Sequence, residues 1–266
     1  MVKVRAVVAA ALLIGAGSPA ARANLKPGKL LGFGYAFYVG PTMVKGSTAV
    51  GAIALNGAPF SRRIGWNERR YQAGVDGAVG PGGLAEPVVR FQLHASLAGE
   101  RTAMLPLANG GGLVGSWGGS YAMVTVGAEP YRVRFAPQIT RSYVGAASAL
   151  RVATALGGRV EGAAEPVTIA FGIARPVRGM VLARPLVIGP LSLTRIGVRT
   201  AEGGGAAAIP KAGDPSAEAD PDEVVVTARS KHKPRPGTVT LDADVLTRCS
   251  SIVFDKPTKQ VRLTCA

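Results

Sequence analysis

Residues 121–158 constrain the fold more than any other part of this 266-residue chain. Apolar and polar residues alternate on both sides of a Gly127-Ala-Glu-Pro130 segment, which predicts a β-hairpin over 121–135. The chain then passes through residues 136–144 into an Ala-rich run, 145–156, that stops at Gly157-Gly158 and predicts one short helix. The predicted order is therefore strand, turn, strand, loop and helix.

This order resembles the start of a repeat in the retropepsin- and pepsin-like aspartic peptidases. In that family the loop reads Asp-Thr-Gly-Ala, and an ungapped comparison puts these positions on Ala136, Pro137, Gln138 and Ile139. The flanking residues match, whereas the catalytic triplet does not, and no Asp-Thr-Gly or Asp-Ser-Gly occurs anywhere in the chain. The resemblance implies the family's two-lobed β fold around a degenerate active-site loop.

A second segment, 75–84, resembles the Asp-Gly-hydrophobic-hydrophobic-Gly segment found late in each repeat of the family. Its members here are Asp76, Gly77 and Gly80. In that fold the segment threads beneath the catalytic loop, and its glycines permit close passage of the backbone. For Asp76 we expect a structural role, the capping of a turn by its side chain. Residues 87–93 form the expected closing strand.

Local turn signals predict two more hairpins. Asn56-Gly57 favours a type I′ turn, which would place Ile53 opposite Phe60 and Ala49 opposite Ile64. A Gly-Pro pair at 189–190 divides 186–198 into two strands. With 36 glycines and 19 prolines, the chain favours many short strands over long helices.

The fold class that we expect is all-β: two-lobed, aspartic-peptidase-like β-barrel repeats with one short helix and a disordered insertion. Residues 202–237 form that insertion, because their small residues, prolines and separated acidic and basic runs cannot bury a core. The expected units are a signal peptide (1–23), the back half of a first repeat (24–98), a second repeat (99–201), the insertion (202–237) and a closing hairpin (238–266).

The N-terminus has the three regions of a secretory signal peptide: a charged start, an apolar run from Ala6 to Ala16, and a small-x-small site at 21–23. This predicts export to the periplasm or beyond. An alternative is that residues 12–18, which faintly resemble a second eroded peptidase loop, belong to a truncated first repeat. The apolar run is too short for a membrane span of ~20 residues.

The basic charge lies in the expected core. The formal net charge is +15, and residues 24–201 hold 19 Lys and Arg against 7 Asp and Glu. Such a surface attracts anionic envelope polymers or acidic peptides, although arginines dispersed over a soluble protein give the same count. The core holds no basic-aromatic recognition motif, and we expect no nucleic-acid partner.

The candidate chemistry is sparse. Aspartic peptidases need two carboxylates that share a proton, and the methyl group of Ala136 can neither take nor give one. The two histidines and two cysteines are too scattered for a metal cluster, and no cofactor is expected. Three hypotheses remain: a pseudo-peptidase that binds an extended peptide or envelope polymer without cutting it, an active peptidase with a non-standard carboxylate, and an envelope adaptor. The adaptor would act through residues 222–229, which resemble a TonB box.

The closing residues 239–265 resemble the last segment of a repeat, with Asp242 in place of the family's glycine. We predict a hairpin centred on Pro257, because proline fixes φ and has no N–H to pair. This register sets Phe254 opposite Gln260, Val253 opposite Val261, Ser251 opposite Leu263 and Cys249 opposite Cys265. Opposed residues lie ~4.5–5.5 Å apart at Cα, and a Cys249–Cys265 disulfide is therefore expected in an oxidising compartment.

Overall fold

The computed structural model describes residues 12–14, 33–55, 58–69, 71, 77–109, 119–202, 205–212 and 236–266. Its secondary structure is mostly β, with one helix of 11 residues and three shorter helical turns. The strands are β1 Leu12–Ile14, β2 Phe33–Val39, β3 Thr42–Leu55, β4 Ala58–Trp66, β5 Gly77–Val79, β6 Val88–Gln92, β7 Arg101–Asn109, β8 Ser120–Val126, β9 Glu129–Phe135, β10 Tyr143–Val144, β11 Gly158–Ala170, β12 Ile173–Ile188, β13 Leu191–Arg199, β14 Gly237–Leu241, β15 Cys249–Asp255 and β16 Gln260–Cys265. The helices are α1 Ala146–Leu156 and α2 Ala243–Leu246, with 3-10 turns η1 Pro81–Gly83 and η2 Gly205–Ala208.

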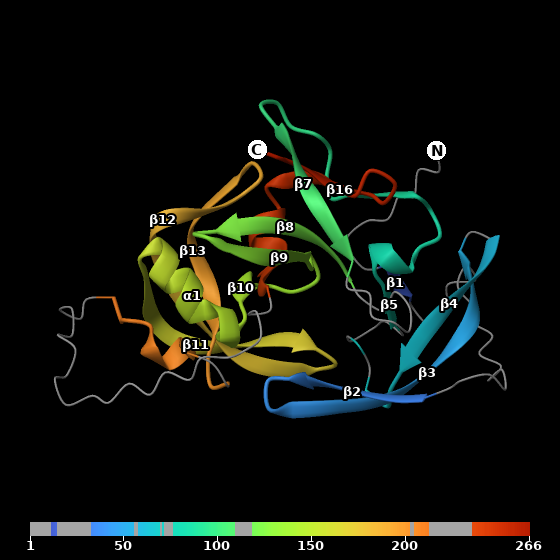
Figure 1. Cartoon of the computed structure of the whole chain (residues 1–266), viewed down its shortest axis with the longest axis horizontal. Helices are drawn as coiled ribbons and strands as arrows, with labels where there is room; N and C mark the ends of the chain where they lie inside the picture. The colour runs from blue at the N-terminus through green and yellow to red at the C-terminus, as the bar shows by residue number, and fades with distance from the viewer. Residues whose placement is uncertain are drawn as a thin grey trace.

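The strands form one large sheet and two small ones (Figure 1). The large sheet has the order β11-β12-β13-β10-β14-β9-β8-β7-β16-β15-β6, and β2-β3-β4 and β1-β5 form the others. Only two neighbouring pairs in the large sheet are parallel, β10 with β13 and β14 with β9. The expectation of an all-β fold with one short helix is confirmed. The expected barrels are not closed among the described residues, because β11 and β6 stand at the two ends of the sheet order.

The elements with strong local signals form as predicted. Ile53 pairs with Phe60 and Ala49 with Ile64, although the Asn56-Gly57 turn itself lies outside the described residues. Helix α1 ends at Gly157, which has φ 69° and donates its N–H to the carbonyl of Ala153. Glycine adopts this left-handed conformation without a Cβ penalty, and it therefore stops the helix where the sequence predicted.

Two apolar cores hold the described strands together. The larger one lies between α1 and the large sheet and includes Tyr131, Met180, Leu241 and Phe254. The smaller one joins the β2–β3 turn to the β11–β12 hairpin and to the loop after β9; its buried residues are Val39, Val44, Ala136, Ile139, Tyr143, Val167, Ile169, Ile173 and Val177. The smaller core therefore fixes the β11–β12 hairpin next to the loop after β9, which holds Ala136 and Ile139.

The expected insertion begins later than predicted. Glu202 is only 9% exposed, and η2 is followed by Ile209, which is buried. The backbone of residues 210–212 brackets Val160 of β11, with hydrogen bonds of 2.8 Å from Val160 N to Pro210 O and 2.7 Å from Ala212 N to Val160 O. The small side chains of residues 205–212 allow this segment to pack closely against α1 and β11. The composition of the same segment had indicated disorder. Residues 213–235, and with them the TonB-box-like segment 222–229, lie outside the described residues.

Part of the expected signal peptide is a strand. β1 runs antiparallel to β5, with Leu12 opposite Val79 and Ile14 opposite Gly77. The remaining residues of 1–23 lie outside the described part of the chain. The two interpretations of the N-terminus therefore differ in whether β1 exists in the mature protein.

The last hairpin differs from its predicted register by one residue. Asp255 pairs with Gln260, Phe254 with Val261 and Ile252 with Leu263. The prediction was wrong here because the loop has four residues, 256–259, which puts Pro257 in its second position and Lys259 at φ 53°.

A register shift between Cys249 and Ser251 restores the predicted pairing of the two cysteines. Cys249 and Cys265 form a disulfide, with their sulfur atoms 2.09 Å apart. Their Cα atoms are 3.8 Å apart, closer than expected for opposed residues. The bulged residue, Ser250, lies directly beside this pair.

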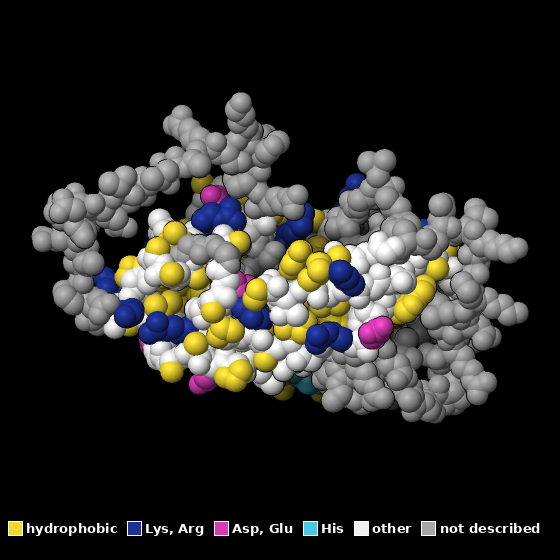
Figure 2. Space-filling model, turned by 90° about the horizontal axis from the view of Figure 1, so that it is seen from below, with side chains coloured by type: hydrophobic (Ala, Val, Ile, Leu, Met, Phe, Trp, Pro, Cys, Tyr) yellow, Lys and Arg dark blue, Asp and Glu magenta, His cyan; other side chains and the backbone are white. Residues whose placement is uncertain are grey.

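No helix in the described ranges combines the length and apolarity needed to cross a bilayer. Figure 2 shows Lys and Arg side chains spread over one face of the protein among apolar and neutral residues. On this face the basic charge is dispersed rather than gathered into one run.

Candidate functional site

The loop between β9 and β10 crosses the end of a strand from the closing segment. β14 lies between β9 and β10 in the sheet, parallel to β9 and antiparallel to β10. Residues 136–142 must therefore pass over the carboxyl end of β14 to connect its two neighbours. We call this segment the crossing loop.

Backbone and side-chain hydrogen bonds tie the crossing loop to residues 241–244. Ala136 N donates to Leu241 O at 2.8 Å, and Ala243 N donates to Ile139 O at 3.2 Å. Asp242 N donates to the hydroxyl of Ser142 at 2.8 Å. The loop also closes on itself, because Ile139 N donates to Ala136 O at 2.9 Å. Asp242 is thus flanked on both sides by contacts to the loop.

Asp242 is a fully buried acid, with an exposed fraction of 0%. Neither of its carboxyl oxygens has a hydrogen-bond partner in the described part of the chain. Burial, together with the nearby charge of Asp244, raises the pKa of Asp242 to about 9, and the positive charge of Arg134 opposes this only in part. At neutral pH Asp242 is therefore a neutral carboxylic acid.

Asp244 has the opposite environment. Its two carboxylate oxygens accept the N–H of Ser142 at 2.9 and 3.0 Å, and Oδ1 also accepts the Ser142 hydroxyl at 2.6 Å. Both oxygens of this exposed carboxylate are thereby engaged by Ser142. Asp244 therefore serves to hold the crossing loop against α2.

The residues aligned with the catalytic triplet lie within the crossing loop. Ala136 has no exposed surface and Ile139 is 5% exposed, and both belong to the smaller core. Pro137 is buried, and Gln138 is partly buried. Gln138 Nε2 donates to the hydroxyl of Tyr71 at 3.2 Å, while its Oε1 has no partner among the described residues.

A cavity of about 730 Å³ opens beside the crossing loop. Its lining includes Gln138, Ile139 and Thr140 from the crossing loop and residues at the tip of the β11–β12 hairpin. The ring of Phe171, at that tip, meets the ring of Tyr71 edge to face at a centroid distance of 5.3 Å. The remaining lining residues are Arg69, Pro166, Thr168, Ile169, Ala170 and Gly172. The cavity offers aromatic and apolar walls with few charges.

Part of the predicted threading segment 75–84 is described, and its passage beneath a catalytic loop of the first repeat stays a prediction. Gly77 begins β5, which pairs with β1, and the strand beneath the crossing loop is β14. A Cβ added to Gly80 would meet no atom within 4 Å, so close passage of the backbone does not require glycine there. Asp76 lies outside the described residues.

In the sequence Asp242 is distinctive only as a substitution for the family's glycine, and its burial was not predicted. A usable signal was present, because Asp242 directly follows the apolar strand residues Val239 and Leu241 and precedes a second acid. Within the described residues, no three His, Cys, Asp or Glu side chains gather closely enough to hold a metal ion.

Comparison of the chain with protein-family models finds no match, and comparison with curated proteins finds none either.

Proposed function

We propose that this protein is an exported pseudo-peptidase of aspartic-peptidase-like fold that binds an extended peptide without cleaving it. The observation that carries the proposal is the chemistry of the crossing loop. Ala136, in the position that the resemblance assigns to the catalytic acid, is a buried methyl group, and Asp242 and Asp244 do not replace that acid. Asp242 is neutral and shielded from water, whereas Asp244 is fully engaged by Ser142.

The cavity beside the loop supports the binding half of the proposal. An extended peptide carries alternating side chains and unpaired backbone groups, and grooves bind it through pockets and backbone hydrogen bonds. Phe171 and Tyr71 supply an aromatic wall for an apolar or aromatic peptide side chain, and Gln138 and Thr140 add polar side chains to the lining.

The test is a peptide library incubated with the purified protein, followed by mass spectrometry of both retained and cleaved peptides. We expect retention without cleavage. Thr140→Trp and Thr168→Trp should abolish retention, because both threonines are exposed and line the cavity, which the larger side chain would fill. Thr125→Trp, the same change at an exposed threonine of β8 outside the cavity, should retain peptides normally.

A second candidate is an active peptidase with a non-standard carboxylate. The unpartnered carboxyl group of Asp242 beneath the loop favours it. Cleavage at acid pH that pepstatin inhibits, and that Asp242→Asn or Asp76→Asn abolishes, would replace the first proposal by this one.

A further inference from the structure

A second, larger cavity borders the β2–β3 turn. Its volume is about 900 Å³, and it is lined by that turn, the bulged part of β11, the end of β13 and the η2 segment. Neither Gln138 nor Phe171 lines it, and it is therefore separate from the proposed peptide cavity.

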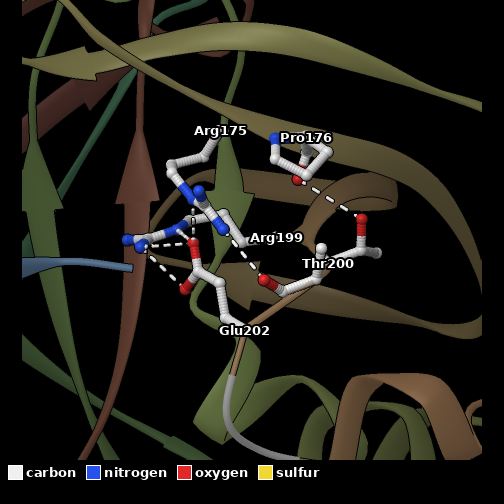
Figure 3. Close-up of polar contacts among 6 residues, drawn as sticks. Arg175, Pro176, Arg199, Thr200 and Glu202 are labelled. Atoms are coloured by element: carbon white, nitrogen blue, oxygen red, sulfur yellow. Dashed lines mark hydrogen bonds and ion pairs between the residues drawn. The ribbon is translucent and has the colours of Figure 1, made fainter. Parts of the chain in front are cut away.

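Among the described lining residues, positive charge exceeds negative charge, with Arg178, Arg199 and Lys211 against Glu202. Glu202 accepts hydrogen bonds from two guanidinium groups: Arg175 Nε at 2.9 Å, and Arg199 through Nε at 2.9 Å and Nη2 at 2.7 Å (Figure 3). The side chains of Arg175 and Arg199 are only 12% and 15% exposed. One carboxylate thus balances two largely buried cations, and buried charges are stable when they are balanced by counter-charges.

Of the two arginines bound to Glu202, Arg199 lines this cavity and Arg175 does not, and two other cations line it as well. Arg178 donates its Nε to Gly162 O at 2.7 Å, and Lys211 follows η2. In the described ranges neither side chain has a carboxylate within ion-pair distance. Their charged groups are therefore available to an oxyanion, for which guanidinium and ammonium groups are strong donors.

The rest of the wall is apolar. Tyr38 is 68% exposed although it is a large aromatic residue, and it lies beside Pro41 at the β2–β3 turn. Val160 and Ile209 contribute aliphatic surface from β11 and the η2 segment. The cavity thus combines a cationic end with an apolar wall.

We propose that this cavity binds a small organic oxyanion, a carboxylate or a phosphate ester with an apolar substituent. The oxyanion is held by Arg178 and Lys211, and it adds negative charge beside Arg199, which shares the carboxylate of Glu202 with Arg175 among the described residues. The apolar substituent packs against Tyr38 and Pro41. This site does not depend on the proposed peptide binding.

The test is calorimetric titration of the full chain at low salt with hexanoate and hexyl phosphate, with hexanol, hexylammonium and inorganic phosphate as controls. We expect one of the two amphiphilic anions to bind and hexanol and hexylammonium not to bind. The better anion identifies the oxyanion class. Binding by neither anion, or binding of hexanol as tightly as either, would overturn the proposal, and inorganic phosphate that binds as tightly as hexyl phosphate would remove the apolar half of it.

Variants assign the site. The double change Arg178→Gln/Lys211→Gln should weaken binding about tenfold or more, since hydrogen bonds to charged groups contribute at that scale. Neither residue forms an ion pair in the described part of the chain, which favours retention of the fold. Arg90→Gln, at an exposed position on β6 outside the cavity, should leave affinity within about twofold. Equal loss in both variants would indicate general charge attraction and overturn the assigned site.

Discussion

Replacing Asp242 by asparagine should make the protein more stable as the pH rises, relative to the parent. The carboxyl group is fully buried and unpartnered, and its pKa is raised from 3.8 to about 9. Between about pH 4 and pH 9 the folded protein therefore holds a proton on Asp242 that the unfolded chain has released. Because the folded state binds more protons in this window, stability falls as pH rises through it.

The magnitude follows from the linkage relation. One proton bound in the folded state alone lowers the free energy of unfolding by about 1.4 kcal/mol for each pH unit. From pH 5 to pH 8 this amounts to about 4 kcal/mol. Asparagine has nearly the same shape as aspartic acid and does not titrate. Its own unpaired amide therefore changes the free energy of unfolding by an amount that does not depend on pH.

The assay is urea unfolding of parent and Asp242→Asn at several pH values from 5 to 8. We expect the free energy of unfolding of the variant, minus that of the parent, to rise by about 4 kcal/mol across this range. The control is Asp255→Asn. The backbone N–H and hydroxyl of Thr258 lower the pKa of that partly buried acid. Its contribution is present above the unfolded pKa of about 4 and is lost only at more acid pH, so the control difference should be flat from pH 5 to 8.

A flat difference for Asp242→Asn as well would refute the reasoning, because it would mean that Asp242 is ionised in the folded protein. If the variant does not fold, the parent alone still provides a test. Its infrared spectrum at pH 7 should contain the C=O band of a protonated carboxylic acid, and absence of that band would contradict the assignment.

Three other predictions are independent of this one. Alkylation without reduction should leave Cys249 and Cys265 unmodified in the intact-mass spectrum. Reduction should lower the free energy of unfolding by up to ~3 kcal/mol, because the disulfide closes a loop across 16 positions. Two alkylated cysteines before reduction would show that the disulfide does not form. Asp244→Ala should lower the free energy of unfolding in urea by ~1–3 kcal/mol, because it leaves the N–H and hydroxyl of Ser142, which is 2% exposed, without their acceptor. An unchanged unfolding midpoint would show that these hydrogen bonds do not hold the crossing loop. If export occurs, protein recovered from the periplasm of an expression host should begin at Asn24 by N-terminal sequencing, and β1 is then absent from the mature protein. An N-terminus that retains Leu12 would favour the truncated-repeat interpretation.

The sequence predicted the elements whose causes are local. The pairing of Ile53 with Phe60 depends on a two-residue turn, and the end of α1 depends on one glycine, Gly157. Both are decided within a few residues, and both appear as predicted. The same holds for the turn at Gly189, which connects Ile188 to Leu191.

The candidate site depends on contacts that local patterns do not encode. The parallel pairing of β14 with β9 joins residues more than a hundred positions apart, and together with the pairing of β14 with β10 it places Asp242 beneath the crossing loop. The predicted register of the last hairpin was wrong by one residue, and the bulge at Ser250 shifts the strands back so that Cys249 pairs with Cys265 as predicted. The geometry of the turn alone could not reveal this bulge. The order of the η2 segment arises from packing of small side chains against α1, whereas composition reports only that those residues are small.

The position of β15 and β16 in the large sheet has a consequence for the order of events during synthesis. These two strands stand between β7 and β6, and Gln92 Nε2 reaches the carbonyl of Ser250, 158 residues later in the chain, at 3.1 Å. β6 and one edge of β7 therefore emerge from the ribosome long before their partners exist. At typical synthesis rates of about 5–20 residues per second, that interval lasts on the order of ten seconds. During it, the nascent chain exposes unpaired strand edges, and a holding chaperone would have its greatest effect on yield at this stage.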